Sequence, residues 1–371
     1  MKILFTIGNF GIGGKERQLV ELIKNLDKSR FEVHLIAKQI DKNISAQLKN
    51  HTSSTFLIGM SIKNYFLKLF NIVKYINSVK PQIIFTWSDL TSKIIFALIK
   101  FRLIDSSIVN CSTRSAPQKI SLKVAIERLL NRLYPVIVSN SMAGLEVYNS
   151  KARNATFILR NGFDINRIGH IKNLSKKEAK LICKMGENKF CVLMVGRLCP
   201  QKDYPRYILT AKEYFKRNAE AIFYIAGEGK QRKYLEKLVR KHLLQDRVVF
   251  LGYVKDVETL IKGSDLLVLL SNKSIGEGSS NVLMESLAIG TPVLADDNPG
   301  NRELLGKDLF SLIMTDKHPS MIANKISEVR KNPIVFEKYA KIGSSRMINH
   351  YSMTKMLNDF QRIVEYITKS N

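Results

Sequence analysis

The amino-acid sequence predicts an α/β protein with two successive doubly wound parallel sheets. Short apolar runs typical of β-strands alternate with amphipathic, helix-like stretches along the whole chain. A polar, Lys-rich stretch over residues 172–189 interrupts this alternation, which then starts again. The length of 371 residues also exceeds the size at which one hydrophobic core usually stops growing. We therefore expect an N-terminal domain over 1–163, completed by a C-terminal helix over 352–371, and a C-terminal domain over 164–351.

The first half of the chain supplies the first set of alternating elements. The strand-like run KILFTIG precedes the helix-like segment ERQLVELIKNL, in which apolar residues recur at helical spacing. The strand-like runs FEVHLIA, PQIIFTW and SIVNC follow, and PVIVSN precedes the helix-like segment SMAGLEVY. This order predicts a parallel sheet that is covered by helices on both faces.

The second half repeats the pattern. Its strand-like runs are FCVLMVG, AIFYIAG, RVVFLG, DLLVLLS and TPVLA, and the segment 354–366 has the pattern of an amphipathic helix. Ligands of doubly wound sheets bind beyond the carboxyl ends of the strands, so we expect the functional site in a cleft between the two domains.

Composition limits the classes of protein and partner. Hydrophobic residues make up 45% of the chain, which suffices for two cores and excludes a disordered protein. Lys and Arg total 59 against 32 acidic residues, and the net charge of +27 favours nucleic acid, anionic lipid or phosphorylated small molecules as partners. Four cysteines without CxxC spacing favour a reduced, cytosolic setting. No apolar run approaches the ~18–20 residues of a membrane span, so we expect a soluble or peripheral protein.

The most informative stretch is GEGSSNVLMESLAIGTPVLADDNPG, over residues 276–300. It follows a predicted strand, and its glycines permit close approach of the backbone to a ligand. Side chains able to cap the helix NVLMESLAIG stand before it, and a helix N-terminus suits a phosphate: Ser279, Ser280 and Asn281. Glu277 and Glu285 are placed to reach a ligand and a ribose. A solvated Glu beside an ordinary capped helix is the alternative interpretation.

Two further segments carry phosphate-binding features. In VGRLCPQKDYP, Arg197 and Lys202 flank a turn after a strand, where two cations can clamp a diphosphate, although a basic protein places many lysines in such turns. In GNFGIGGKERQL, two glycines open a helix after the first strand. A dinucleotide fingerprint needs a third glycine where this chain has Glu16, which argues against an oxidoreductase.

Together, these motifs resemble the family-4 retaining glycosyltransferases of the GT-B fold, also called glycosyl transferases group 1. EGSSNVLME matches their Glu-x7-Glu motif, and GTPVLADDNPGNRELL resembles its continuation. The resemblance implies two facing Rossmann-like domains and transfer from a nucleotide-sugar. It also implies that Arg197 and Lys202 bind the pyrophosphate and stabilise the leaving group, and that Glu277 contacts the hydroxyls of the transferred sugar.

The resemblance assigns further roles residue by residue. It implies a set of donor-binding residues, of which Glu285 contacts the ribose: Gly14, Gly196, Gly227, Ser279, Ser280, Asn281 and Glu285. The glycine-rich first loop and its Glu16 resemble the family's acceptor side, and Asn161 and Gly162 resemble its interdomain turn. Many members carry a His where this chain reads VNCSTRSAP, so we expect Arg114 to bind an acceptor phosphate instead. Asp296 and Asp297 are expected on a loop as a turn or helix-capping pair, and no metal or other cofactor is expected.

The predicted function is therefore retaining transfer of a hexose or N-acetylhexosamine, from UDP rather than GDP, to a lipid-linked or envelope glycan in bacterial surface polysaccharide synthesis. The alternatives are a nucleotide-sugar epimerase or hydrolase of the same fold and, less favoured, a basic nucleic-acid-binding protein, although no nucleic-acid motif is present.

Apolar and basic residues mingle in the first half of the chain and can form a cationic rim: Lys93, Lys100, Arg102, Lys119, Lys123, Arg128 and Arg132. Such a rim would hold the protein to an anionic membrane surface, in a cytoplasmic, peripheral location on the inner face of the cell membrane. Core-facing helices with solvated lysines explain the same pattern, and both interpretations stay open.

Overall fold

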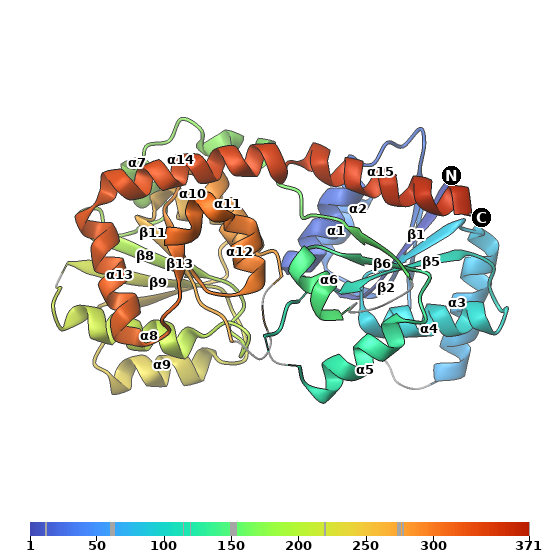
Figure 1. Cartoon of the computed structure of the whole chain (residues 1–371), viewed down its shortest axis with the longest axis horizontal. Helices are drawn as coiled ribbons and strands as arrows, with labels where there is room; N and C mark the ends of the chain where they lie inside the picture. The colour runs from blue at the N-terminus through green and yellow to red at the C-terminus, as the bar shows by residue number, and fades with distance from the viewer. Residues whose placement is uncertain are drawn as a thin grey trace. The chain divides into compact units, whose positions relative to one another are not determined.

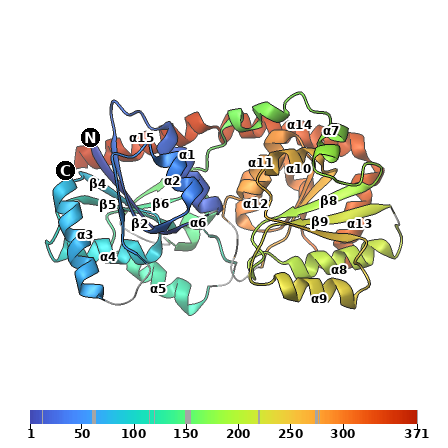
Figure 2. The same cartoon turned by 180° about the vertical axis from the view of Figure 1, so that it is seen from behind.

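The computed structural model describes the chain except for Ile12, 60–63, Arg114, Lys119, 149–153, Ala219, 273–275, Glu277 and Asn371. The chain divides into two compact units. The N-terminal unit comprises residues 1–115, 120–162 and 353–371, and the C-terminal unit comprises residues 116–119 and 163–352. Each unit contains one parallel sheet with helices on both faces, which confirms the predicted fold class (Figures 1 and 2).

The sheet of the N-terminal unit has the strand order β3-β2-β1-β4-β5-β6-β7. Its strands are β1 (Lys2–Phe10), β2 (Glu32–Ile40), β3 (Ser54–Leu57), β4 (Ile83–Thr86), β5 (Ser107–Thr113), β6 (Val136–Ser139) and β7 (Ala155–Ile158). Its helices are α1 (Gly14–Asn25), α2 (Lys42–Leu48), α3 (Tyr65–Val79), α4 (Asp89–Lys100), α5 (Leu122–Asn131), α6 (Met142–Tyr148) and α15 (Met353–Ser370).

Two apolar clusters cover the two faces of this sheet. One joins α1, α2 and α15 to the strands, and Phe360 of α15 lies 4.9 Å from Phe85 and 6.1 Å from Phe5 between ring centroids. The other joins α3 and α4 to the opposite face through residues such as Ile76 and Ile95. The C-terminal helix therefore completes the core of the N-terminal unit.

The sheet of the C-terminal unit has the order β10-β9-β8-β11-β12-β13. Its strands are β8 (Phe190–Val195), β9 (Ala221–Ala226), β10 (Val248–Gly252), β11 (Leu266–Leu269), β12 (Val293–Asp296) and β13 (Ile313–Met314). Its α-helices are α7 (Lys176–Ile182), α8 (Tyr204–Phe215), α9 (Arg232–Lys241), α10 (Val257–Gly263), α11 (Asn281–Ile289), α12 (Pro299–Leu305), α13 (Pro319–Lys331) and α14 (Pro333–His350), and its 3-10 helices are η1 (Ile165–Ile171) and η2 (Lys307–Leu312).

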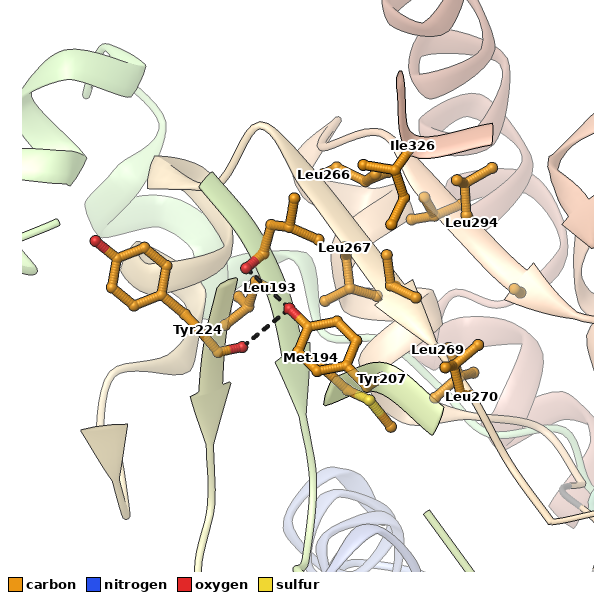
Figure 3. Packing of buried hydrophobic residues seen from close by; sticks show 14 of the residues in the cluster. Leu193, Met194, Tyr207, Tyr224, Leu266, Leu267, Leu269, Leu270, Leu294 and Ile326 are labelled. Atoms are coloured by element: carbon orange, nitrogen blue, oxygen red, sulfur yellow. Dashed lines mark hydrogen bonds between the residues drawn. The ribbon is translucent and has the colours of Figure 1, made fainter. Parts of the chain in front are cut away.

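The core of this unit combines many aliphatic side chains with several aromatic ones, and Tyr207 is one of the polar groups buried inside it. The ring of Tyr207 is fully buried, and its hydroxyl lies 3.0 Å from the carbonyl oxygen of Val192 and 3.3 Å from that of Tyr224 (Figure 3). A buried hydroxyl needs such a partner to offset its lost hydration. The bond ties α8 to β8 and β9 and so fixes the helix whose N-terminus lies beside the candidate site.

Within the described residues, no helix has both the length and the apolarity that crossing a bilayer requires.

Candidate functional site

The candidate site of the C-terminal unit lies at the carboxyl ends of β8 and β11, where the strand order reverses. This is the point at which open α/β sheets bind ligands. The backbone of Lys202, in the turn after β8, forms an antiparallel bridge with Ser271, which follows β11. Two hydrogen bonds extend this pairing: the amide of Asn272 donates to the Gln201 carbonyl at 2.9 Å, and the Gln201 side chain donates to the Gly276 carbonyl at 3.0 Å.

The structure places both predicted cations in this turn. Arg197 is exposed and Lys202 is half-buried. The turn carrying them is held to Ser271, Asn272 and Gly276, although these residues lie far from it in the sequence.

Glycines allow the strand ends beside this turn to approach closely. Gly196 and Gly227 have φ angles of 152° and 135°, which L side chains rarely adopt. A Cβ atom on Gly227 would stand 2.0 Å from the carbonyl oxygen of Gly196. Both predicted donor-site glycines are therefore required by the backbone geometry, independently of any ligand.

The helix α11 begins at Asn281, as predicted, but it lacks the expected cap from Ser280. Ser280 occupies the N-cap position with extended backbone, yet its side chain makes no capping hydrogen bond. Gly276 has a φ of 70°, and a Cβ there would stand 2.4 Å from the Ala116 carbonyl oxygen, so the approach to α11 also needs a glycine. Glu277 lies outside the described residues.

Glu285 lies on the fifth position of α11 and is almost fully buried. Its carboxylate lies 3.4 Å from a guanidinium nitrogen of Arg167, which is on η1. The same guanidinium forms an ion pair with Glu258 of α10. One cation thus holds two carboxylates. Arg167 was not among the predicted site residues, because no recognisable motif surrounds it in the sequence.

Asp296 is the clearest departure from the sequence analysis. It is not on a loop: it is the last residue of β12, it is fully buried, and its carboxylate pairs with Arg206 of α8 at 2.7 Å. Burial raises the pKa of Asp296, while Arg206 and the amide of Ser271 act against that shift. The helix-capping role belongs to Asn298, which caps α12, and Asp297 pairs with the exposed Arg302.

In the N-terminal unit, the predicted glycine-rich loop opens α1 as expected. Gly13 is the N-cap and Gly14 is the first residue of the helix. A Cβ on Gly13 would stand 2.3 Å from a carboxylate oxygen of Glu16, so this side chain folds back over the helix N-terminus, where a negative charge is favoured. Arg114 lies outside the described residues. Thus Gly14 and Glu16 belong to one unit, and the described donor-site candidates beyond Gly14 belong to the other.

Two cysteine thiols of the C-terminal unit are poorly suited to act as nucleophiles, because the thiolate is the reactive form. Burial raises the pKa values of the Cys183 and Cys191 thiols to about 11. Among the described residues, no group of three or more His, Cys, Asp or Glu side chains is arranged to hold a metal ion.

Comparison with known proteins shows what the chain resembles. Residues 175–346 match the family described as Glycosyl transferases group 1. The Escherichia coli UDP-Gal:alpha-D-GlcNAc-diphosphoundecaprenol alpha-1,3-galactosyltransferase is 24% identical over 54% of this chain and 51% of its own length, so the match spans only about half of that relative.

Two other similarities extend over most of the chain. The Campylobacter jejuni N-acetylgalactosamine-N,N'-diacetylbacillosaminyl-diphospho-undecaprenol 4-alpha-N-acetylgalactosaminyltransferase is 27% identical over 86% of this chain and 88% of its own length. The crystal structure of Anabaena HepE in complex with UDP and glucose has a TM-score of 0.82 at 20% identity and covers 99% of both chains. The match over 175–346 and the two parallel-sheet units together identify the chain as a glycosyltransferase of the GT-B fold that carries a group 1 glycosyl transferase domain.

Proposed function

We propose that this glycosyltransferase transfers a hexose or N-acetylhexosamine from a nucleoside-diphosphate sugar to a lipid-linked or envelope glycan, with retention at the anomeric carbon. The observation that carries the proposal is the backbone bridge between Lys202 and Ser271, which fixes the main chain of this lysine at the carboxyl ends of β8 and β11. UDP is the favoured carrier, and GDP is the second candidate. HepE binds UDP in its crystal structure, and two curated relatives act on undecaprenol diphosphates by name, which supports bacterial surface polysaccharide synthesis.

The proposed chemistry depends on charge that develops on the leaving diphosphate. Lys202 and Arg197 neutralise this charge, and preorganised cations do so without reorganisation during the reaction. The N-terminus of α11 adds a partial positive charge on the same edge of the sheet. With these groups handling the diphosphate, the reaction needs no metal ion.

The remaining roles follow from the same arrangement. Glu277 binds the hydroxyls of the transferred sugar and Glu285 binds the ribose. The acceptor attacks from the face that the diphosphate leaves, within a tight ion pair, so neither carboxylate serves as a nucleophile. Glu16 and Arg114 bind the acceptor, and Arg114 does so by pairing with a phosphate group of the acceptor.

Lys202→Ala tests the catalytic assignment. The variant should lower the transfer rate by about 10²–10³-fold, the range seen when one preorganised charge-stabilising group is removed. Lys241→Ala is the matched control, because Lys241 is exposed at the end of α9 and should not affect transfer. Full transfer by Lys202→Ala would contradict the proposal.

Three simpler measurements test the donor, the reaction class and the nucleic-acid alternative. UDP and UDP-sugars should raise the melting temperature of the wild-type protein, because a ligand that binds only the folded state stabilises it. Product analysis without acceptor separates a transferase from an epimerase or hydrolase, since only the latter two convert the donor alone. Binding to random oligonucleotides should be weak, sequence-blind and lost as salt rises.

We also propose peripheral attachment to an anionic membrane through α3, α4 and α5, with a cytoplasmic location at the inner face. Large apolar side chains on these elements are strongly exposed, among them Phe66 (87%), Phe101 (76%) and Leu122 (79%). Lys100, Arg102 and Arg132 line a groove of about 800 Å³ near the amino ends of β5 and β6, and none of the three forms an ion pair with a described residue. This combination of apolar and cationic side chains suits the headgroup region of a bilayer.

Sedimentation with vesicles tests the attachment. The protein should pellet with anionic vesicles at low salt and be released as salt rises. Phe101→Ser with Leu122→Ser should weaken pelleting, while Lys42→Gln with Lys49→Gln, exposed on and beside α2, should affect it less. Equal binding to neutral and anionic vesicles would contradict the electrostatic part of the proposal.

A further inference from the structure

The backbone of Ser271 is held on both sides by one buried ion pair. The Ser271 amide donates to Oδ2 of Asp296 at 2.8 Å, and its carbonyl accepts from Nη2 of Arg206 at 3.1 Å. Arg206 and Asp296 bond to each other through these same atoms at 2.7 Å. Asp296 is fully buried and the Arg206 side chain is 12% exposed. The backbone amide and the backbone carbonyl of Ser271 are therefore both fixed by the Arg206–Asp296 ion pair.

These contacts extend from Ser271 to the turn that carries Lys202. Ser271 forms the antiparallel bridge with Lys202, and the next residue, Asn272, bonds to Gln201. Gln201 in turn binds the Gly276 carbonyl, immediately before Glu277 in the sequence. A shift of Ser271 would consequently move the Lys202 turn, which is also bonded to Asn272 and Gly276.

We propose that Arg206 and Asp296 form a positioning pair that presets the Lys202 turn for the donor's diphosphate without touching the donor. The inference rests on the proposed function, because it assumes that Lys202 binds a nucleoside diphosphate. Arg206 and Asp296 would thus influence donor binding indirectly, by holding Ser271 in place.

A purely stabilising role explains the pair poorly. Removing two charges from water costs free energy that their attraction often fails to offset, and apolar residues of similar volume usually stabilise as well or better. Oδ1 of Asp296 also has no hydrogen-bond partner in the part of the chain that the structure describes. An apolar pair, however, could not hold the amide and the carbonyl of Ser271 in place. Precise placement is what catalytic groups need, since a misplacement of about 1 Å can cost ~100-fold in rate.

A second buried ion pair in the same sheet provides a matched control. At the opposite strand ends, Asp265 accepts from Lys180 at 2.8 Å and from the amide of Cys191 at 2.9 Å. The Lys180 side chain is 8% exposed. This pair also joins a helix to β8 and β11, but it lies at the amino ends of the strands, away from the Lys202 turn.

The experiment measures the dissociation constant of UDP and the kinetic constants of transfer for Arg206→Met, Arg206→Lys and Asp296→Asn. Arg206→Met should weaken UDP binding by about 10-fold or more. Arg206→Lys keeps the charge and should fall between Arg206→Met and the wild type. Asp296→Asn should have the smaller effect, because its side-chain oxygen can still accept from Ser271. Lys180→Met should lower the melting temperature but leave UDP binding within about twofold of the wild type.

A double-mutant cycle with Lys202→Ala separates positioning from general damage. If the pair acts through Lys202, Arg206→Met should weaken UDP binding by less than about twofold in the Lys202→Ala background. Equal effects in both backgrounds would overturn the inference, and so would equal losses for Arg206→Met and Lys180→Met. Should Arg206→Met fail to fold, Arg206→Lys replaces it in the same cycle, because it keeps the buried charge but loses the guanidinium bond to the Ser271 carbonyl, and it should show the same non-additivity.

The outcomes distinguish the inference from the proposed function. A wild-type protein that binds neither UDP nor another nucleoside diphosphate overturns both. Loss of UDP binding in Lys202→Ala, with unchanged binding in Arg206→Met, overturns the positioning pair and leaves the proposed function standing.

Discussion

Each of the two edges of the C-terminal sheet contains an ion pair that joins a helix to the strands, and we assign the two pairs different roles. At the amino edge, Lys180 and Asp265 join α7 to the first residues of β8 and β11. At the carboxyl edge, Arg206 and Asp296 join α8 to the last residue of β12 and to the backbone after β11. Each carboxylate accepts from one backbone amide and pairs with a largely buried cation, and a second cation lies within ion-pair distance of each: Lys176 for Asp265 at 3.1 Å and Lys317 for Asp296 at 3.8 Å. The chemistry of an ion pair therefore does not reveal its role; its place in the sheet does.

The backbone also distinguishes the carboxyl edge, where the candidate site lies, from the amino edge. In a parallel sheet, the carboxyl edge presents the loops and the helix N-termini to solvent, and ligands bind there. The loops at this edge include positions that favour glycine, such as Gly196 and Gly227. Both have φ angles that L side chains rarely adopt, and a Cβ on Gly227 would clash with the backbone of Gly196. Gly186 at the amino edge has no such φ angle, and its nearest neighbours are the flexible side chains of Ile222 and Lys189.

Alanine at these glycines should give the largest contrast between the edges. Gly227→Ala places a Cβ 2.0 Å from a backbone oxygen in a conformation that favours glycine, so a loss of unfolding free energy on the order of 4 kcal/mol or more is expected, with loss of UDP binding. Gly186→Ala meets only side-chain atoms at 2.9 Å and beyond, so it should be far milder. Urea unfolding and UDP titration of both variants check this, and equal damage would remove the contrast.

Breaking the ion pair at the amino edge should affect stability alone. Asp265→Ala leaves the buried Lys180 without its charged partner, and such losses cost on the order of 3 kcal/mol. UDP affinity, measured by calorimetry at a temperature where the variant is folded, should equal that of the wild type. A large fall in UDP affinity would show that the ion pair at the amino edge also affects the candidate site, and the two edges would then not differ in role.

The sequence was sufficient for the fold class but not for the polar networks. Alternating strand-like and helix-like runs predicted both sheets, because burial on both faces leaves long apolar runs that are easy to recognise. Short elements such as β3 and α2 had no comparable pattern. Motifs also located Arg197 and Lys202, since the turn after a strand is fixed by local sequence.

The ion pairs, by contrast, join residues with no local relation. Arg206 and Asp296 are 90 residues apart, and Arg167 and Glu285 are 118 apart. Asp296 was expected on a loop because the resemblance to the family's motif places it there, and aspartate is rarely buried unless it is paired. Only the tertiary fold brings a compensating arginine to it, so no pattern within the segment could have predicted its burial.

Loss of a helix cap should give a smaller effect at the amino edge. Ser175 and Glu178 form a capping box at the start of α7, the helix that carries Lys180. Ser175→Ala should lower the free energy of unfolding by ~1 kcal/mol, the usual cost of losing such a cap. UDP binding should not change. Ser280→Ala is an informative counterpart at the carboxyl edge, because Ser280 makes no capping hydrogen bond and its replacement should cost less stability.

Protonation of Asp296 should give the smallest effect, and its sign is fixed. Burial raises the pKa of Asp296 above its ordinary value of 3.8, so the folded state holds this proton more tightly than the unfolded state. The resulting stabilisation is present below pH 3.8 and is lost as the pH rises through the folded-state pKa. Asp296→Asn cannot titrate, so its stability relative to the wild type should improve as the pH rises through that window. Urea unfolding from acid to neutral pH measures the unfolding free energy of Asp296→Asn minus that of the wild type. If this difference stays constant or falls as the pH rises, the interactions with Arg206 and the Ser271 amide lower the pKa of Asp296 at least as much as burial raises it.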